Sequence, residues 1–224
     1  MRVAALYDVH GNVQALEAVL AEVHREQVDA IAFGGDIAAG PFPRETVDLV
    51  RSLDGVCIRG NADWRDGEWG AHQWVWDQLD EEAAEWLKTL PDQAVLGGIF
   101  FCHATPRSDI EIVTPATPDE RLLEMLAGVE ETLVVAGHTH MQQDRHVSDR
   151  RFVNPGSVGR PYEDVPGAYW AIVGEEIELR RTEYDLEAAA AAVRASGHPL
   201  AAELAAENVL RVPSREEAIA VFGR

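Results

Sequence analysis

The sequence has little cysteine and no long hydrophobic run. Only two cysteines occur among 224 residues, Cys57 and Cys102, and both lie in short apolar stretches. We therefore expect buried, reduced thiols rather than a disulfide framework. No apolar stretch approaches the roughly 20 residues of a membrane-spanning helix, and the first residues lack the pattern of a secretion signal. These absences predict a cytoplasmic protein without a membrane partner.

Basic residues are also scarce. Lys and Arg number 19 against 39 Asp and Glu, which gives a formal net charge of −20. Affinity for a nucleic-acid backbone comes largely from Lys and Arg that neutralise phosphates, so the balance argues against an extended nucleic-acid surface. A small anionic substrate is not excluded, because cations bound at a site would set the local charge there.

The first half of the chain alternates short apolar runs with amphipathic stretches. We predict strands at 3–7, 30–33 and 56–58, and helices at 13–24 and 44–53. This alternation is typical of βαβ units with a parallel sheet. Polar residues and glycine follow each apolar run, where α/β proteins place their ligands.

The second half has a different character. Residues 61–92 hold five of the six tryptophans, and we predict a loop followed by a helix at 81–90, against which the tryptophans would pack. Further strands are expected at 99–102, 132–136, 152–153, 168–173 and 177–184. Residues 1–184 would form one domain, and residues 185–224 a helical extension packed on it, with breaks at Pro199 and Pro213.

Five short polar motifs directly follow predicted strands. They are Asp8-Val-His10-Gly-Asn12, Gly34-Gly35-Asp36, Gly60-Asn61-Ala62-Asp63, His103-Ala-Thr-Pro and Gly137-His138-Thr139-His140. The i, i+2 spacing in the first and last motifs puts both side chains on one side of an extended segment. Adjacent glycines let the backbone turn sharply and leave room for an ion or a phosphate.

The residue types in these motifs predict a metal centre. Carboxylate, amide and imidazole ligands suit Mn²⁺, Fe, Co²⁺, Ni²⁺ or Zn²⁺ better than Ca²⁺ or a thiolate-bound metal. The candidate ligands are Asp8, His10, Asp36, Asn61, His103, His138 and His140. So many groups exceed one tetrahedral site and suit two sites that share a carboxylate. Two cations about 3.5–4 Å apart can bind phosphoryl oxygens and generate hydroxide for in-line displacement, so no nucleophilic serine or cysteine is required.

The order of these motifs, over residues 8–140, resembles that of the calcineurin-like metallophosphoesterase superfamily. The later run Asn154-Pro-Gly-Ser-Val-Gly159 is similar to the segment that closes the site in the small bacterial and archaeal branch, which includes YfcE-like phosphodiesterases. The resemblance implies an α/β fold, a four-layer α/β/β/α sandwich of two mixed β-sheets flanked by helices.

The resemblance also implies a role for each ligand. Asp8, His10 and His140 would hold the first metal and Asn61, His103 and His138 the second, with Asp36 bridging both. Mn²⁺ is the first expectation for the two ions. The catalytic set implied is Asp8, Asp36, Asn61 and His103.

Ala62 departs from the superfamily pattern, which often has a histidine at this position to protonate the leaving group or bind phosphate. Loss of a general acid typically costs about 10²–10⁴-fold, so substrates that leave as stable anions should suffer least. This favours phosphodiesters or activated esters. Asp63 remains and could orient a neighbouring ligand, as carboxylates behind a metal ligand do.

Two further residues are candidates for substrate binding. Asn12 could orient a ligand or contact phosphate, and Arg107 could clamp a phosphate with its planar fork or form an ion pair with Asp109 or Glu111. Alone, His103 would be more typical of a core histidine and Asn61 of a turn residue; the other motifs favour ligation for both.

Together these features predict a metal-dependent phosphodiesterase that hydrolyses small, nucleotide-like phosphate diesters through hydroxide activated by two metal ions. A phosphomonoesterase or protein phosphatase is the alternative within the enzyme class. A non-catalytic scaffold on the same fold is a third hypothesis, which the complete ligand set disfavours. The sequence leaves homo-oligomerisation open.

Overall fold

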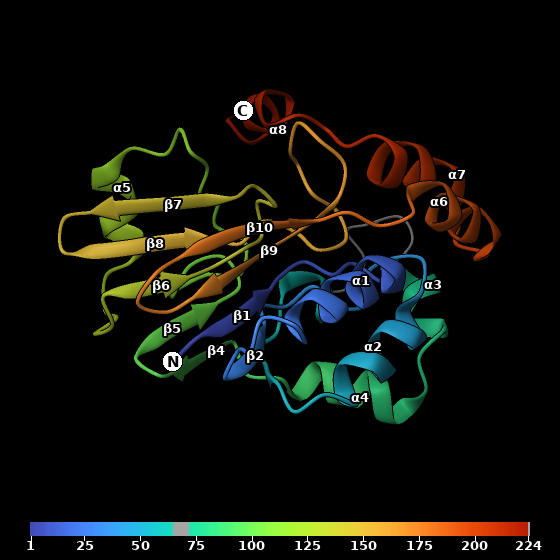
Figure 1. Ribbon diagram of the computed structural model, residues 1–224, viewed down its shortest axis with the longest axis horizontal. Helices are drawn as coiled ribbons and strands as arrows, with labels where there is room; N and C mark the ends of the chain where they lie inside the picture. The colour runs from blue at the N-terminus through green and yellow to red at the C-terminus, as the bar shows by residue number, and fades with distance from the viewer. Residues whose placement is uncertain (65–71, 224) are drawn as a thin grey trace.

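Two mixed β-sheets lie face to face at the centre of the molecule (Figure 1). The computed structural model describes residues 1–64 and 72–223, so Trp69 of the tryptophan-rich segment lies outside the described residues. The first sheet has the spatial order β10-β9-β1-β2-β3 and the second β4-β5-β6-β8-β7. Parallel pairs join β1 to β2, β2 to β3, β5 to β6 and β6 to β8, and the remaining neighbours are antiparallel.

The strands of the first sheet are β1 (Val3–Leu6), β2 (Ala30–Phe33), β3 (Val56–Cys57), β9 (Ala168–Val173) and β10 (Glu178–Thr182). Those of the second are β4 (Gln93–Leu96), β5 (Ile99–Cys102), β6 (Leu133–Val135), β7 (Gln143–Val147) and β8 (Arg150–Asn154). Central strands β1, β5 and β9 are buried along their whole length, which explains why they are continuous apolar runs rather than alternating ones.

Alternation along β1 shows how one strand contributes to two layers. Val3 and Ala5 face the second sheet, in a core that also contains Phe101, whereas Ala4 and Leu6 pack against the helices on the other side. Successive side chains of a strand point to opposite faces, so both faces of the sheet must be covered to remain dry.

Helices supply the two outer layers. Those over the first sheet are α1 (Val13–Val23), α2 (Pro43–Arg51), α3 (His72–Asp77) and α4 (Glu81–Thr89), and α5 (Asp119–Met125) covers the second sheet. Leu16, Val47 and Leu87 bring α1, α2 and α4 into one core with the first sheet. Leu122 of α5 packs with Phe152 of the second. The predicted four-layer α/β/β/α sandwich is confirmed.

The structure differs from the sequence prediction in four elements. α3 lies in a stretch predicted as loop, and β4, α5 and β7 were not expected. β7 is an edge strand whose residues alternate between buried and exposed and include two charged side chains, Asp144 and Arg145, so it has no apolar run to mark it. α5 has only seven residues, too few for a helical period to be clear.

The chain ends in a group of short helices, α6 (Leu186–Ala195), α7 (Ala201–Leu204), the π-helix η2 (Ala205–Leu210) and α8 (Arg215–Phe222). Val193 and Val209 form a small core there, and Phe42 from the first half of the chain packs against it. Within the described residues, no helix combines the length and the apolar character that crossing a membrane would require.

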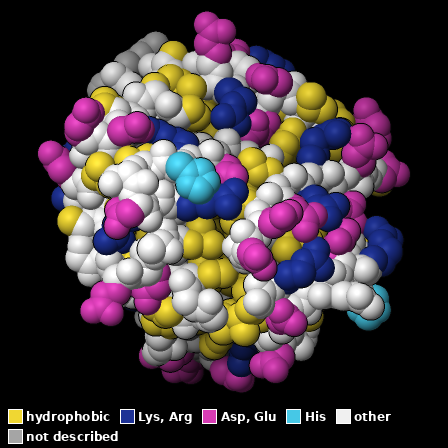
Figure 2. All heavy atoms as spheres, turned by 60° about the vertical axis from the view of Figure 1, so that its left-hand side comes forward, with side chains coloured by type: hydrophobic (Ala, Val, Ile, Leu, Met, Phe, Trp, Pro, Cys, Tyr) yellow, Lys and Arg dark blue, Asp and Glu magenta, His cyan; other side chains and the backbone are white. Residues whose placement is uncertain are grey.

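Acidic and basic side chains are interspersed over the face shown in Figure 2, and no continuous basic track is visible on it. The acidic excess of the sequence is therefore spread over this face as scattered carboxylates rather than gathered into one patch.

Candidate metal centre

The predicted ligands follow five strands that end at the same edge of the two sheets. Asp8 and His10 follow β1, Asp36 follows β2, and Asn61 lies in the 3₁₀ turn η1 (Asn61–Asp63) after β3. His103 follows β5, and the His138 to His140 segment follows β6. Parallel strands place their carboxyl ends together, so residues far apart in the sequence meet at one point.

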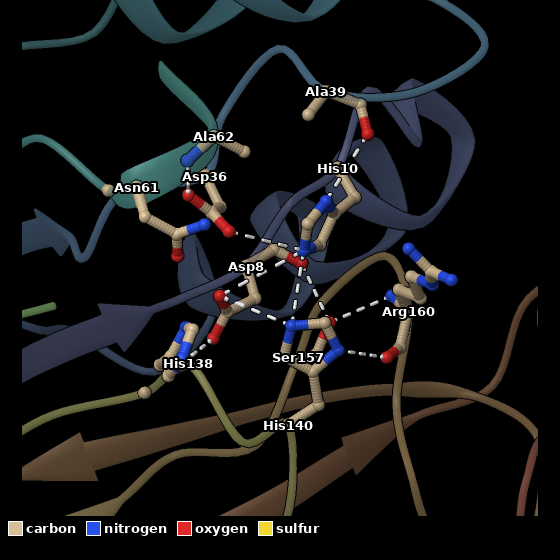
Figure 3. A network of polar contacts seen from close by, with 12 residues as sticks. Asp8, His10, Asp36, Ala39, Asn61, Ala62, His138, His140, Ser157 and Arg160 are labelled. Atoms are coloured by element: carbon tan, nitrogen blue, oxygen red, sulfur yellow. Dashed lines mark hydrogen bonds and ion pairs between the residues drawn. The ribbon is translucent and has the colours of Figure 1, made fainter. Parts of the chain in front are cut away.

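Two buried carboxylates lie at the centre of this cluster (Figure 3). Asp8 Oδ2 accepts a hydrogen bond from the His138 backbone N–H at 2.9 Å, and Asp36 Oδ1 accepts one from the Ala62 N–H at 2.7 Å. The second oxygen of each carboxylate is turned toward the histidines. Asp36 Oδ2 lies 3.6 Å from both His10 Nε2 and His103 Nε2, the position expected of a bridging oxygen.

Three histidines are oriented by backbone carbonyls. The Nδ1 atoms of His10, His103 and His140 lie 3.2, 2.8 and 2.6 Å from the carbonyl oxygens of Ala39, Gly34 and Arg160. A carbonyl can only accept, so each Nδ1 carries the proton and each neutral ring presents the lone pair of Nε2 to the centre. Metal-binding histidines are held in this way.

The facing nitrogens make the fit to a cation specific. His10 Nε2 and His140 Nε2 are 3.1 Å apart, and both are lone-pair acceptors in the tautomer that the carbonyls impose. Asn61 Oδ1 lies 3.0 Å from His103 Nε2, so a second pair of acceptors faces the same space. Acceptors at such distances repel one another unless a positive charge lies between them.

Burial of the Asp8 and Asp36 carboxylates also favours a bound cation. Asp8 Oδ1 is buried and has no hydrogen-bond partner within the described residues. Burial raises the pKa of Asp8 to about 7, and burial with the charges of Asp63 and Asp8 raises the pKa of Asp36 well above its ordinary value. A divalent cation would restore the charged carboxylates at neutral pH.

His10, His138 and His140 are kept neutral by the same burial. It lowers the pKa of His138 and His140 to about 3, and that of His10 well below its ordinary value. Neutral imidazole is the form that binds metal. The two clusters of potential ligands, Asp8 with His10 and His140, and Asp8 with Asp36 and His103, share Asp8.

The backbone at these residues is strained. Among the described residues, seven other than glycine have positive φ, and five of them are Asp8, His10, Asp36, His138 and His140. Such conformations cost about 1–3 kcal/mol each and persist only where the surrounding structure imposes them. Their concentration at one point indicates a site whose geometry is selected against local preference.

Glycines and Asp63 fix the carboxylates from behind. A Cβ on Gly60 would lie 2.2 Å from Asp36 Oδ1, and one on Gly137 would lie 2.5 Å from Asp8 Oδ2. Asp63, fully buried, accepts hydrogen bonds from the N–H groups of Ile37 at 2.9 Å and Gly60 at 3.0 Å. It thereby joins the loop that carries Asp36 to the turn that carries Asn61.

The two predicted substrate-binding residues have hydrogen-bond or ion-pair partners within the protein. Asn12 caps α1, since its Oδ1 accepts from the Ala15 N–H, and its Nδ2 donates to the Gly159 carbonyl. Arg107 is nearly half exposed and forms an ion pair with Glu111 at 2.5 Å, one of the alternatives that the sequence left open.

Ser157, Arg160 and Tyr162 are the site neighbours that sequence analysis missed as individuals. Ser157 Oγ donates to the Asp8 carbonyl and accepts from the Arg160 N–H, both at 2.7 Å. Tyr162 stacks on the His140 ring, with centroids 4.8 Å apart. Their signal was position alone, because all three lie within or just after the Asn154–Gly159 run.

Comparison with known proteins gives consistent results. Residues 1–176 match the calcineurin-like phosphoesterase superfamily domain. An uncharacterized protein of Methanocaldococcus jannaschii is 28% identical over 221 residues, which cover 84% of this chain and 89% of that protein. The crystal structure of a metallophosphoesterase from Sphaerobacter thermophilus is similar with a TM-score of 0.78 at 30% identity, over 93% of this chain and 99% of that one. The E. coli phosphoesterase YfcE shares the fold with a TM-score of 0.56 at 21% identity, over 81% and 93% of the two chains.

Proposed function

The chain belongs to the calcineurin-like phosphoesterase superfamily, and from this premise we propose that it hydrolyses small, nucleotide-like phosphate diesters with two divalent transition-metal ions. Mn²⁺ is the first choice for both ions, with Fe, Zn, Ni and Co as alternatives. Membership of the family supports a metal-dependent phosphoester hydrolase; the preference for diesters and the identity of the metal are the proposal.

One observation carries the two-metal assignment. Acceptor atoms with no compensating donor converge from both sides on the carboxylates of Asp8 and Asp36. On this basis Asp8, His10 and His140 would hold one ion, and Asn61 and His103 the other. His138, whose ring centroid lies 5.2 Å from that of His103, is added to the second site on the resemblance to the family. Asp36, whose Oδ2 is equally far from one histidine on each side, would bridge the two ions.

The residues of the chain then have defined tasks in catalysis. Two cations, when bound by these residues, would supply polarisation of phosphoryl oxygens and a lowered pKa of water. The carbonyls of Ala39, Gly34 and Arg160 hold the imidazoles in the ligand tautomer, and Asp63 fixes the spacing between Asp36 and Asn61. This fixed arrangement is what lets polar groups stabilise developing charge without reorganising.

Ala62 favours diesters over monoesters. It follows Asn61 directly, is only half-buried, and has no group that could protonate a leaving alkoxide. Without a general acid at this position, substrates with a good leaving group should be hydrolysed best. A diester also carries less negative charge than a monoester, so it depends less on additional positive groups.

The test is metal analysis of the purified protein paired with hydrolysis assays. We expect two equivalents of a transition metal per chain, and a higher kcat/KM for a nitrophenyl diester such as bis(p-nitrophenyl) phosphate than for p-nitrophenyl phosphate when Mn²⁺ is added. Clear preference for the monoester would overturn the diester assignment. Binding of no transition metal, with no hydrolysis of either compound, would favour a scaffold.

A further inference from the structure

Arg160 is a half-buried cation beside the candidate metal centre. It lines a narrow pocket between the His10 loop and the C-terminal helices, together with His10, Gly40, Val193, Asn208 and Val209. In Figure 3 the contacts drawn at Arg160 end on its backbone, whose N–H donates to Ser157 and whose carbonyl accepts from His140. The guanidinium itself takes no part in them.

The missing partner distinguishes Arg160 from other arginines. Its Nε is buried without a hydrogen-bond partner in the described part of the chain. Among the arginines described by the structure, only Arg25 and Arg194 also have a side chain without a hydrogen bond or an ion pair, and both are exposed to solvent. In a chain with 39 acidic residues, a half-buried arginine left unpaired indicates that its partner is not among the described residues.

Arg160 lies directly beside the candidate metal ligands. Its carbonyl is 2.6 Å from His140 Nδ1, and its side chain lines the same pocket as His10. Like charges repel, so a guanidinium beside bound metal cations is unfavourable unless an anion joins them.

We infer that Arg160 binds the non-bridging oxygens of the substrate phosphate while the metal centre holds the same group. Guanidinium is the side chain whose planar fork matches phosphate geometry, and its hydrogen bonds to an anion are about twice as strong as neutral ones. Asn208 and Val209 of the π-helix η2 line the same pocket, so the C-terminal helices wall the side of the site on which Arg160 lies. This inference rests on the proposed function and adds a substrate-binding residue to it.

The experiment measures binding of inorganic phosphate, a product of monoester cleavage and a mimic of the substrate group, to the Mn²⁺-loaded protein by calorimetry. R160Q should bind phosphate about 10- to 100-fold more weakly than the unchanged protein. R160K should fall between the two, because it keeps the charge but loses the fork. R194Q is the matched control, since it removes an exposed, unpaired arginine on α6 and should leave phosphate binding unchanged.

A second measurement on the same variants separates substrate binding from a structural role. The Arg160 carbonyl, which orients His140, is retained in R160Q, and loss of the positive charge removes repulsion. Mn²⁺ affinity should therefore stay the same or increase while phosphate affinity falls. Unchanged phosphate binding by R160Q, an equal loss in R194Q, or a loss of Mn²⁺ affinity in R160Q would overturn the inference. Phosphate binding is measurable whether or not the protein hydrolyses a diester, so failure here is distinguishable from failure of the proposed function.

Discussion

The two sides of the candidate metal centre are built differently. On one side, which we call the His140 half, His10 and His140 face each other, Tyr162 stacks on His140, and Arg160 and η2 wall the pocket beyond. On the other side, the His103 half, Asn61 faces His103, and the next residue along the chain is Ala62, which is half-buried and has no functional group.

This difference suggests a division of labour. The His140 half has an unpaired cation and a wall made by the end of the chain, which suits holding a phosphate. The His103 half is pinned by Asp63 and lacks a proton donor at Ala62, which suits a leaving group that needs no protonation. Asp36 is common to both, so its loss should affect them together, whereas changes behind or beside one half should have smaller effects.

Asp36→Asn should have the largest effect. Asp36 lies between the two halves, so its loss should weaken metal binding in both of them. A neutral amide at the proposed bridging position should reduce metal binding from two equivalents to one or none and lower kcat/KM roughly a thousandfold or more. Far-UV circular dichroism should be unchanged, because the core cluster between the sheets does not include Asp36.

Metal analysis and diester hydrolysis of Asp36→Asn also test the assignment of Asp36 as the bridging ligand. Near-normal turnover with two bound ions would show that Asp36 does not bridge. Asp80→Asn is the control, because Asp80 only caps α4 and pairs with Arg44 at the surface, and asparagine is an equally good cap.

Asp63→Asn should have an intermediate effect that is larger in the His103 half. Its carboxylate accepts N–H donors from both Ile37 and Gly60, and an amide would turn an NH₂ group toward one of them. Groups that orient metal ligands typically contribute about 10- to 100-fold to affinity. Competition with a chelator, followed for each equivalent of Mn²⁺, should show one ion weakened more than the other. Equal weakening of both would mean that Asp63 supports Asp36 rather than Asn61.

A smaller effect is expected in the pH dependence of metal binding. It tests whether Asp8, the carboxylate that both clusters of potential ligands share, is protonated before metal binds. In the metal-free protein the pKa of Asp8 is raised to about 7 by burial, while the pKa of His140 is lowered to about 3. At pH 6 Asp8 is mostly protonated and His140 is neutral, so metal binding must displace a proton from carboxylate and none from that imidazole.

Apparent Mn²⁺ affinity should therefore fall about tenfold per pH unit for each proton displaced as the pH drops below about 7. Calorimetry at pH 6 in buffers of different ionisation enthalpy should detect proton release on addition of Mn²⁺. Affinity that stays constant down to pH 5 would show that Asp8 is already ionised without metal.

Much of this organisation could be predicted from the sequence, for identifiable reasons. It was predictable that the motifs at the ends of apolar runs would meet, because parallel strands end at one edge of a sheet. The structure brings Asp8, Asp36 and His103 together there. The left-handed backbone at Asp8 and His140 was not, because aspartate and histidine adopt it only occasionally and the assembled fold decides where they do.

Long-range partners were equally inaccessible. Arg160 looks like any surface arginine in the sequence, and its significance depends on the packing of η2, nearly fifty residues later, against the pocket that it lines. For Arg107 the sequence left two kinds of role open, and the structure shows the ion pair with Glu111 at i+4. Local pattern thus indicated the ligands, and tertiary packing determined which charges stay unpaired around them.

Ala62→His should have the smallest effect. It adds to the His103 half the proton donor for the leaving group that this half lacks. The Ala62 N–H that binds Asp36 belongs to the backbone, so the substitution leaves that contact in place. Turnover of an alkyl-ester substrate should rise about tenfold relative to a nitrophenyl diester, below the 10²–10⁴-fold of an evolved general acid, because nothing around the new ring has been selected to orient it. The gain should disappear as the pH rises above about 6.5, where an ordinary imidazole loses its proton.

Ala62→Asn, of similar reach but unable to donate a proton in this range, is the matched variant. An equal gain in both variants would attribute the effect to a polar contact with substrate, and the His103 half would then differ from the His140 half in shape rather than in acid catalysis.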